Sequence, residues 1–450
     1  MAAGQTRGNQ QLTWIHAIGG DFRDRIEATA TTPDGGFLLV GQSKSFQVVS
    51  PVDYDIWVLK VDQFGFIVWE YTLGEDGPGE TGWDAVPTAE GGCVLLGLGL
   101  RPGDTDSDAW ILKLNPTGTL AWQKSYGGLE NEVAYALCTG HGGGYVAAGS
   151  SASLAASTAG WLVRVGDDGS SLWQGAYGGT ASEGFNDVAA ANDGGYIAVG
   201  STDTNTGSSK AWVVKVDGGG ALVWQKELSG QSGLAARKVL AATDGGFYIS
   251  GGGCLVKLDA TGDLVWQRRT GATGLGLVED GDGNIYHSAT FYLDQVDFAG
   301  YRWAKMNASG DFIEGKAYWA QTTLDEWNRD LLPTDDGGFL LSGWTNDPNM
   351  GAGFDDAFLL KLDGSGSADA YIPARIIDFN GPFQASDLSI ADSFVTAALG
   401  NVTPADLALD PVAVQSTVTI HGGNPLIPSW IQWPSLTVVD LANLVNQFGL

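Results

Sequence analysis

The sequence predicts an all-β fold, a seven-bladed β-propeller closed by its N-terminal strand and followed by a C-terminal extension outside the repeat. Three observations carry this prediction. The motif Asp/Asn-x-x-Gly, followed in most copies by a Trp four residues later, recurs seven times if a weaker copy that begins with Gly166 is included. A double glycine before an apolar stretch recurs in register with it. Neighbouring Trp copies lie about 51–53 residues apart, which is the spacing of propeller blades rather than of helical repeats.

The first motif ends one strand, makes a tight turn and begins the next strand. An acceptor side chain at the first position and Gly at the fourth suit a type I turn that closes a short hairpin. Trp follows the turn at positions 69, 122 and 173, and again at 224 and 266, whereas Glu314 and Ala370 replace it in the last two copies. The turns themselves are Asp62–Gly65, Asn115–Gly118, Gly166–Gly169, Asp217–Gly220, Asp259–Gly262, Asn307–Gly310 and Asp363–Gly366.

One repeat, 122–173, shows the four strands expected in each blade. They are predicted at Glu132–Cys138, Gly144–Gly149, Trp161–Val165 and Ser171–Gln174. The third strand carries an aromatic residue in six repeats and Cys254 in the fifth. We predict that the Trp residues of the third and fourth strands both belong to the hydrophobic core.

The two ends of the repeat region predict how the ring closes. The seventh repeat ends after Gly366 without a fourth strand, and residues ~10–18 match an isolated fourth strand that contains Trp14. Pairing these pieces completes the last blade and hides two edges that otherwise invite aggregation. The expected domains are a propeller at 1–371 and an extension or small docking domain at 372–450.

The extension is rich in proline and poor in charge. Short strands are predicted at Ala374–Phe379 and Thr417–His421, and a terminal amphipathic helix at Val438–Phe448. Because the ring closes without this segment, it is expected to contact a protein partner or another copy of the chain. A cap on the propeller and a separate small domain are the alternatives.

Composition excludes several classes of function. The net charge of −29 and pI near 4.2 disfavour nucleic acids and anionic membrane surfaces as partners. The sequence has no apolar run long enough to span a bilayer, and residues 1–10 lack the apolar region of a signal peptide. Cys93, Cys138 and Cys254 fall at apolar strand positions and are expected to be buried free thiols.

No residue pattern nominates a catalytic or cofactor-binding site. The four histidines share no metal-ligand spacing, and the common hydrolase and nucleotide-binding motifs are absent from the sequence. Two stretches carry the alternating oxygen donors of a calcium loop but lack its glycine and closing glutamate, so ordinary acidic turns are the alternative to a Ca²⁺ site. The candidate ligands are Asp104, Asp106, Asp108, Asp280, Asp282 and Asn284.

Aromatic residues outside the repeated positions suggest a glycan-binding function. Trp83, Trp327 and Trp344 are candidate exposed platforms on which sugar rings could stack. A glycosidase or lyase with paired carboxylates is a further alternative, although the sequence contains too many acids to select two.

The combined pattern D-G-G-[YF]…D-x-W-[VIL]-x-K-x-D…G…W-Q-K-x-Y-G-G, across about residues 10–370, resembles the propeller repeats of large bacterial and archaeal surface and secreted proteins. Leu258–Trp266 also resembles the tryptophan-docking repeat of quinoprotein dehydrogenases, which are eight-bladed. The first resemblance implies a non-enzymatic interaction protein. We therefore expect a structural role on a cell-surface layer, an extracellular filament or a virion, with docking through 372–450.

Overall fold

The structure is a computed structural model, and it describes most of the repeat region and parts of the extension. Structural statements refer to residues 13–46, 54–74, 79–100, 106–155, 157–178, 182–203, 209–229, 235–271, 274–293, 298–319, 326–346, 354–367, 375–378, 389–392, 396–400, 405–406, 412–413 and 417–421.

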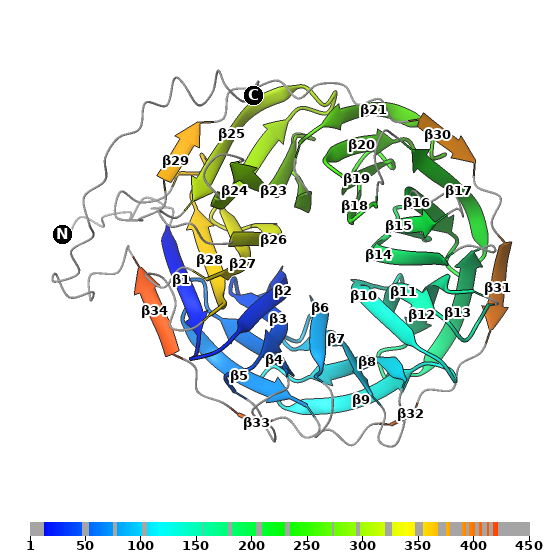
Figure 1. Cartoon of the computed structure of the whole chain (residues 1–450), viewed down its shortest axis with the longest axis horizontal. Coiled ribbons are helices and arrows are strands. Elements are labelled where there is room, and N and C mark those ends of the chain that lie inside the picture. Colours follow the sequence, from blue (N-terminus) through cyan, green and yellow to red (C-terminus); the bar gives the residue numbers. More distant parts are fainter. Residues whose placement is uncertain are drawn as a thin grey trace, which may run out of the picture.

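Seven antiparallel sheets of four strands each surround a common axis, which confirms the predicted fold class (Figure 1). Each blade runs from an innermost first strand to an outer fourth strand. Blades 1 to 3 are β2 Asp24–Thr31, β3 Phe37–Ser43, β4 Asp55–Val61, β5 Ile67–Leu73; β6 Thr81–Pro87, β7 Cys93–Leu100, β8 Ser107–Leu114, β9 Leu120–Tyr126; and β10 Glu132–Thr139, β11 Tyr145–Ser151, β12 Ala159–Val165, β13 Ser171–Gly178.

Blades 4 to 7 repeat this order, with blade 5 having the shortest inner strands. They are β14 Ser182–Ala190, β15 Tyr196–Asp203, β16 Lys210–Val216, β17 Leu222–Ser229; β18 Lys238–Ala241, β19 Phe247–Gly251, β20 Cys254–Leu258, β21 Leu264–Arg269; β22 Gly274–Glu279, β23 Ile285–Leu293, β24 Phe298–Met306, β25 Phe312–Trp319; and β26 Glu326–Pro333, β27 Phe339–Thr345, β28 Asp356–Leu362, β1 Trp14–Gly19.

The N-terminal strand closes the ring as predicted. Strand β1 pairs antiparallel with β28 and places Ile15 opposite Leu360. Blade 7 therefore combines residues from both ends of the repeat region, and its outer strand carries Trp14 where blades 1 to 5 carry their own Trp.

The Asp/Asn-x-x-Gly turns form because their first and fourth residues satisfy the local backbone. In the copy at Asp259, the amide of Gly262 donates to the Asp259 carbonyl, and Gly262 adopts φ = +82°, which a Cβ would strain. The Asp259 carboxylate also accepts hydrogen bonds from the amides of Thr261 and Asp263. The turn is thus closed by both backbone and side-chain hydrogen bonds.

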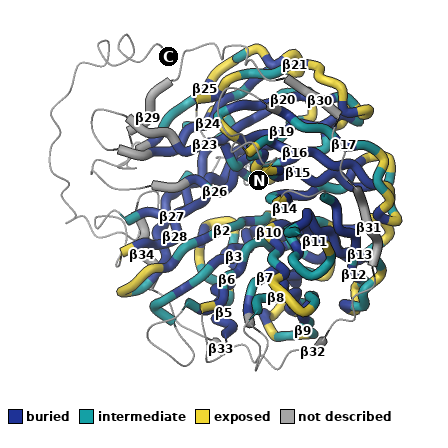
Figure 2. The backbone as a smooth tube through the Cα atoms, turned by 45° about the vertical axis from the view of Figure 1, so that its right-hand side comes forward, coloured by how far each residue is buried: buried dark blue, intermediate teal, exposed yellow. Residues whose placement is uncertain are grey.

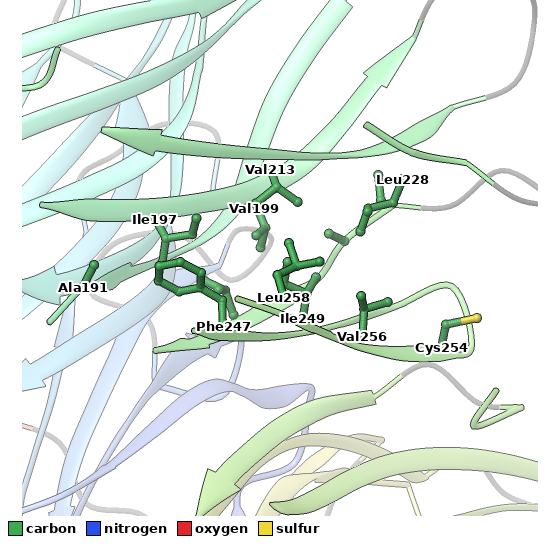
Figure 3. Close-up of a cluster of buried hydrophobic side chains, with 13 residues drawn as sticks. Ala191, Ile197, Val199, Val213, Leu228, Phe247, Ile249, Cys254, Val256 and Leu258 are labelled. Carbon is green, nitrogen blue, oxygen red and sulfur yellow. The ribbon is translucent and has the colours of Figure 1, made fainter. Parts of the chain in front are cut away.

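The hydrophobic core lies between blades. Seven clusters of buried side chains occur, and each draws its members from two neighbouring blades. Figure 3 shows the cluster between blades 4 and 5, where Val199 and Val213 face Phe247 and Leu258. The blade interiors are buried and exposed residues gather toward the outer strands and turns (Figure 2). The three cysteines are free, two of them buried and Cys138 half-buried.

Six short strands from the C-terminal extension pair with the outer edges of the blades. We call these strands the belt: β29 Arg375–Asp378 on blade 6, β30 Ser389–Asp392 on blade 4, β31 Thr396–Gly400 on blade 3, β32 Ala405–Asp406 on blade 2, β33 Val412–Ala413 on blade 1 and β34 Thr417–His421 on blade 7. All pair antiparallel, and they follow one another around the rim (Figure 1).

Within the described residues, blade 5 is the only blade without a belt strand. The predicted strand at Thr417–His421 is confirmed as β34, and that predicted at Ala374–Phe379 corresponds to β29. The predicted helix at Val438–Phe448 lies outside the described residues.

Candidate functional site

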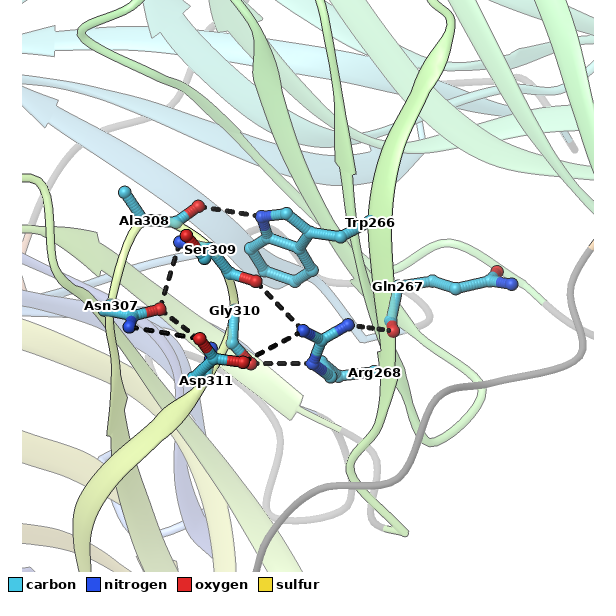
Figure 4. A network of polar contacts seen from close by, with 8 residues as sticks. All are labelled: Trp266, Gln267, Arg268, Asn307, Ala308, Ser309, Gly310 and Asp311. Carbon is cyan, nitrogen blue, oxygen red and sulfur yellow. Dashed lines mark hydrogen bonds and ion pairs between the residues drawn. The ribbon is translucent and has the colours of Figure 1, made fainter.

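The fourth-strand Trp residues hold neighbouring blades together as well as packing on the core between them. In six blades the indole Nε1 donates to a carbonyl in the Asp/Asn-x-x-Gly turn of the next blade, as from Trp266 to Ala308 at 2.8 Å (Figure 4). The other five are Trp14 to Gln63, Trp69 to Pro116, Trp122 to Asp167, Trp173 to Gly218 and Trp224 to Ala260, at 3.0–3.2 Å.

The prediction that both repeated Trp sets belong to the core holds in full for the third-strand set. In the fourth-strand set, Trp14 and Trp266 are core members and the other four pack against the core clusters from their edge. The third-strand Trp residues are 0–1% exposed, whereas four of the six fourth-strand Trp rings are half-buried: Trp69, Trp122, Trp173 and Trp224. An indole on an outer strand has one face on the next blade and the other toward solvent. Burial is therefore partial, and the N–H is free to reach the turn.

In blades 1, 3 and 4 the residue after the fourth-strand Trp accepts a hydrogen bond from the third-strand Trp of the same blade. The Nε1 of Trp161 donates to Gln174 Oε1 at 3.0 Å, and that of Trp57 donates to Glu70 Oε1 at 2.6 Å. A buried indole N–H without a partner is costly, so the polar residue at this position has a structural role. The Trp-Gln pair in the repeat motif thus links one blade internally and to its neighbour.

Many acidic residues of the motifs pair with lysines inside their own blade. Lys257 Nζ lies 2.7 Å from Asp244, and Lys215 Nζ lies 2.8 Å from Asp193. The lysine side chains are only 2–3% exposed, and their charge is held by the carboxylate of the double-glycine turn. The Asp of D-G-G and the Lys of D-x-W-V-x-K are therefore one structural unit.

Four ionisable side chains on innermost strands interact around the axis of the ring, and we call them the central cluster: Asp84 on β6, Asp187 on β14, Lys238 on β18 and Asp330 on β26. In blades 2, 4 and 7 a β-bulge immediately precedes the Asp, between Gly82 and Asp84 in the first case. A bulge re-aims the following side chain and frees an amide. Figure 1 places these four strands around the centre.

The central carboxylates also join blades. Asp84 Oδ2 accepts a hydrogen bond from the amide of Leu137 in blade 3, and Asp187 Oδ2 accepts one from Val239 in blade 5, at 2.8 and 2.7 Å. Burial raises the pKa of Asp84 to about 7, opposed by the attraction of Lys238. Burial likewise raises the pKa of Asp187 and of Asp330, while Asp187 raises the pKa of Lys238.

The central cluster combines a retained positive charge with carboxyl groups of differing proton affinity. A carboxyl group with a pKa near 7 exchanges protons at neutral pH, which is one requirement of a general acid or base. The same group is engaged with backbone amides, so its demonstrated contacts are structural. No group of three or more His, Cys, Asp or Glu residues in the described part of the chain is arranged to hold a metal ion.

An aromatic pair adjoins the central cluster. Trp83 precedes Asp84 in the bulge of β6 and packs edge-to-face against Tyr135, with ring centroids 5.1 Å apart. The indole Nε1 of Trp83 is buried and has no hydrogen-bond partner among the described residues. Tyr135 is 37% exposed, so this pair is accessible from the solvent on one side.

The other predicted aromatic platforms lie elsewhere. Trp344 is only 6% exposed and its ring contacts the Arg25 guanidinium at 4.3 Å, so the expectation that it is exposed is wrong. Trp344 lies on β27, and Arg25 on β2 of blade 1 covers its ring. Trp327 pairs with Trp344 in the β26–β27 register, and its side chain lies outside the described residues.

The predicted calcium ligands do not converge on one site in the described residues. The carboxylate of Asp280 accepts hydrogen bonds from the amides of Asp282 and Asn284 and from the Asn284 side chain, and Lys305 lies 3.5 Å away. These donors occupy oxygens that a cation would need. Asp108 is buried and Asp106 half-buried, while Asp104 lies outside the described residues. Calcium binding stays a prediction.

The sequence contained a signal for the central cluster that repeat counting alone did not use. Asp84, Asp187, Lys238 and Asp330 each stand nine residues before the first residue of the second strand in their blade. Aligning the repeats at the double glycine brings these charged residues into one column. That these four side chains interact could not be inferred without knowing that their blades form one ring.

Histidines contribute no shared site. His16 contacts the Gly65 carbonyl at 3.0 Å and packs on Trp14, and burial lowers the pKa of His287 to about 3, which keeps it neutral. The described residues include no helix long and apolar enough to cross a membrane.

Comparison with known proteins adds little beyond the fold. No family model matches the chain, and no curated protein matches it. Among solved structures, it is similar to a protein of unknown function from Dyadobacter fermentans, with 14% identity, a TM-score of 0.45 and coverage of 77% of this chain and 98% of that one.

Two further solved structures are similar at the same level. A puromycin hydrolase has 12% identity and a TM-score of 0.44, covering 82% of this chain and 54% of the hydrolase. A protein described as a putative gluconolactonase has 13% identity and a TM-score of 0.32, covering 62% of this chain and 90% of that one. At these scores the likenesses carry no functional argument.

Proposed function

We propose that this protein is a non-enzymatic structural or interaction protein, a rigid propeller displayed on a larger assembly at a cell surface, in an extracellular filament or on a virion. The observation that carries the proposal is the belt. The charges and indoles at the described repeat positions are used to hold blades together, while the extension is bound along the rim by strand addition. Strand addition to a sheet edge is a common mode of peptide recognition.

The docking element is the end of the extension. The last described belt strand is β34 on blade 7, and residues 422–450 contain one charged residue, Asp440, together with Trp430 and Trp433. A segment of this composition gains free energy by burying its apolar side chains against a partner. Anchoring the preceding residues to the rim fixes where that segment begins.

The experiment compares a truncated chain with a chain in which the same segment is replaced. A chain ending at His421 keeps the belt and is expected to remain a folded monomer that no longer assembles, by circular dichroism, light scattering and electron microscopy. A chain in which 422–450 is replaced by a Gly/Ser linker of equal length controls for size. Unchanged oligomerisation of the truncated chain would overturn the docking role.

The second candidate is a carbohydrate-binding propeller, favoured by the Trp83–Tyr135 pair beside the central carboxylates. Aromatic faces near hydrogen-bond acceptors are suited to sugar rings. A glycan array with the intact protein and the Trp83→Ala variant tests it. Binding that disappears in the variant would support this candidate, and an array without signal would remove it.

A further inference from the structure

The belt advances by a fixed seven residues per blade. In each blade that has a belt strand, we compare the pairing at one position, the residue two positions after the fourth-strand Trp position. In blade 4 this residue is Lys226, which lies opposite Asp392 of the belt. From there the opposing residues are Leu399 on blade 3, Asp406 on blade 2, Ala413 on blade 1 and Ile420 on blade 7. Four successive steps are therefore seven residues each.

The step across blade 5 is twice as long. Blade 6 places Asp378 opposite Lys316, and the next belt contact is Asp392 on blade 4. The interval is fourteen residues, which is two steps of seven. A segment that passed over blade 5 without pairing would have no reason to keep this multiple, because a loop tolerates added or lost residues at little cost.

Blade 5 offers the edge that this spacing requires. Its outer strand β21 is the only fourth strand without a belt partner among the described residues. An unpaired sheet edge is a template for another strand.

The chemistry at the register position is consistent along the belt. Asp stands opposite each lysine, at Lys316, Lys226 and Lys124, whereas Ala, Leu and Ile stand opposite Tyr71, Gly175 and His16. Opposite charges across a strand pair contribute roughly 0.2–1 kcal/mol. The belt sequence is thus matched to the blade it crosses.

In blade 5 the register position is Arg268, and seven residues before Asp392 stands Ala385. The Arg268 guanidinium is already bound by the carbonyls of Gly310 and Ser309, at 2.7 and 2.9 Å, and lies 3.4 Å from Asp311 (Figure 4). An uncharged residue opposite it leaves no charge unpaired.

We propose that the outer edge of blade 5 is the seventh docking position of the belt and that residues 383–385 of the same chain occupy it, antiparallel, with Ala385 opposite Arg268. The occupant is this segment rather than a second copy, because the seven-residue step fixes it between β29 and β30. The belt then surrounds the whole ring, one short strand per blade.

Disulfide trapping tests this register. The double variant Arg269→Cys/Gln384→Cys joins residues that the proposal places directly opposite each other, where Cβ atoms lie within reach of a disulfide. The matched positive control is Glu227→Cys/Ala391→Cys, the equivalent pair in blade 4, which the structure shows opposite each other. Arg269→Cys/Asn380→Cys, four residues out of register, is the negative control.

After mild oxidation, disulfides are mapped by mass spectrometry of non-reduced peptides, and gel mobility separates intrachain from interchain products. An intrachain disulfide in the blade 5 pair and the blade 4 pair, with none in the shifted pair, supports the proposal. An interchain disulfide assigns the edge to a second copy and overturns it, as does absence of the blade 5 disulfide while the blade 4 disulfide forms.

The result is independent of the docking function of 422–450. The chain ending at His421 retains every residue of the proposed pairing, so the same disulfide pattern is expected from it. Loss of assembly with a retained blade 5 disulfide would support both proposals separately. Loss of assembly without the blade 5 disulfide would refute only the belt register, and retained assembly with the disulfide would refute only the docking role.

Discussion

The Nε1 of Trp266 in blade 5 donates a hydrogen bond to the carbonyl of Ala308 in blade 6, and the ring of Trp266 covers Gly310 of the same turn. A Cβ built on Gly310 would lie 2.7 Å from the indole. The glycine is therefore required twice, for its positive φ and for the approach of the neighbouring blade. The Asp/Asn-x-x-Gly turn that defines the repeat is therefore also a contact between neighbouring blades.

The first prediction separates these two requirements. Gly310 and Gly283 have φ of +75° and +78° in the same blade, but a Cβ on Gly283 meets nothing within 4 Å. Gly283→Ala should cost about 1–2 kcal/mol of unfolding free energy from backbone strain. Gly310→Ala should cost about 1–3 kcal/mol more, from overpacking against the ring. Urea denaturation measures the unfolding free energy of both variants. Equal losses would contradict the close contact between Gly310 and the Trp266 ring.

The second prediction concerns the buried lysines. Asp244→Asn leaves the Lys257 ammonium, on a side chain 3% exposed, without its carboxylate. It should destabilise the protein by about 1–3 kcal/mol, whereas Lys257→Met, which removes the charge itself, should cost less. Thermal unfolding of the two variants and of the double variant gives the coupling. A larger loss in Lys257→Met would contradict this account.

The third prediction is the pH dependence of these pairs. Desolvation raises the pKa values of Asp193 and Asp244, but the lysine and backbone hydrogen bonds and the lysine charge together hold both pKa values below the ordinary value. A lowered folded-state pKa gives stability that is present above the unfolded value near 4 and lost as pH falls through the folded value. The unfolding free energy should therefore fall below about pH 4, and less steeply in Lys257→Met.

The fourth prediction has the opposite sign. The pKa of Asp84 is raised to about 7 by burial, so its contribution to stability is present below the unfolded pKa and is lost as pH rises through 7. The wild-type protein should lose stability between about pH 4 and 7 through this group. Asp84→Asn should flatten that part of the profile, and an unchanged slope would show that Asp84 titrates normally.

The fifth prediction is slow thiol chemistry. Burial raises the pKa of the Cys93 thiol to about 12 and raises that of Cys138 as well. Because the thiolate is the reactive species, both should react with a thiol reagent only as the protein unfolds. Labelling followed by mass spectrometry, in native buffer and in urea, measures this. Rapid native labelling of either residue would contradict the buried placement.

The sequence by itself determined the number of blades, the strand order, the turns and the closure by Trp14. These follow from local rules: a glycine at the fourth turn position, apolar residues in short runs, and the same pattern repeated at a constant interval. It also placed β34 at Thr417–His421. It did not separate the third-strand Trp from the fourth-strand Trp, because both occupy a repeated aromatic position and only the neighbouring blade distinguishes them.

Only the tertiary structure decided what meets across blades. The central cluster joins residues more than fifty positions apart, and the seven-residue step of the belt is set by the distance between outer strands around the rim, not by any local conformation. Of the six belt strands, only β29 and β34 were predicted from the sequence, and strands as short as the two-residue β32 and β33 carry too little pattern to be recognised alone. Once the ring exists, the recurrence of Asp378, Asp392 and Asp406 every fourteen residues has a physical cause: each stands opposite a lysine on an outer strand.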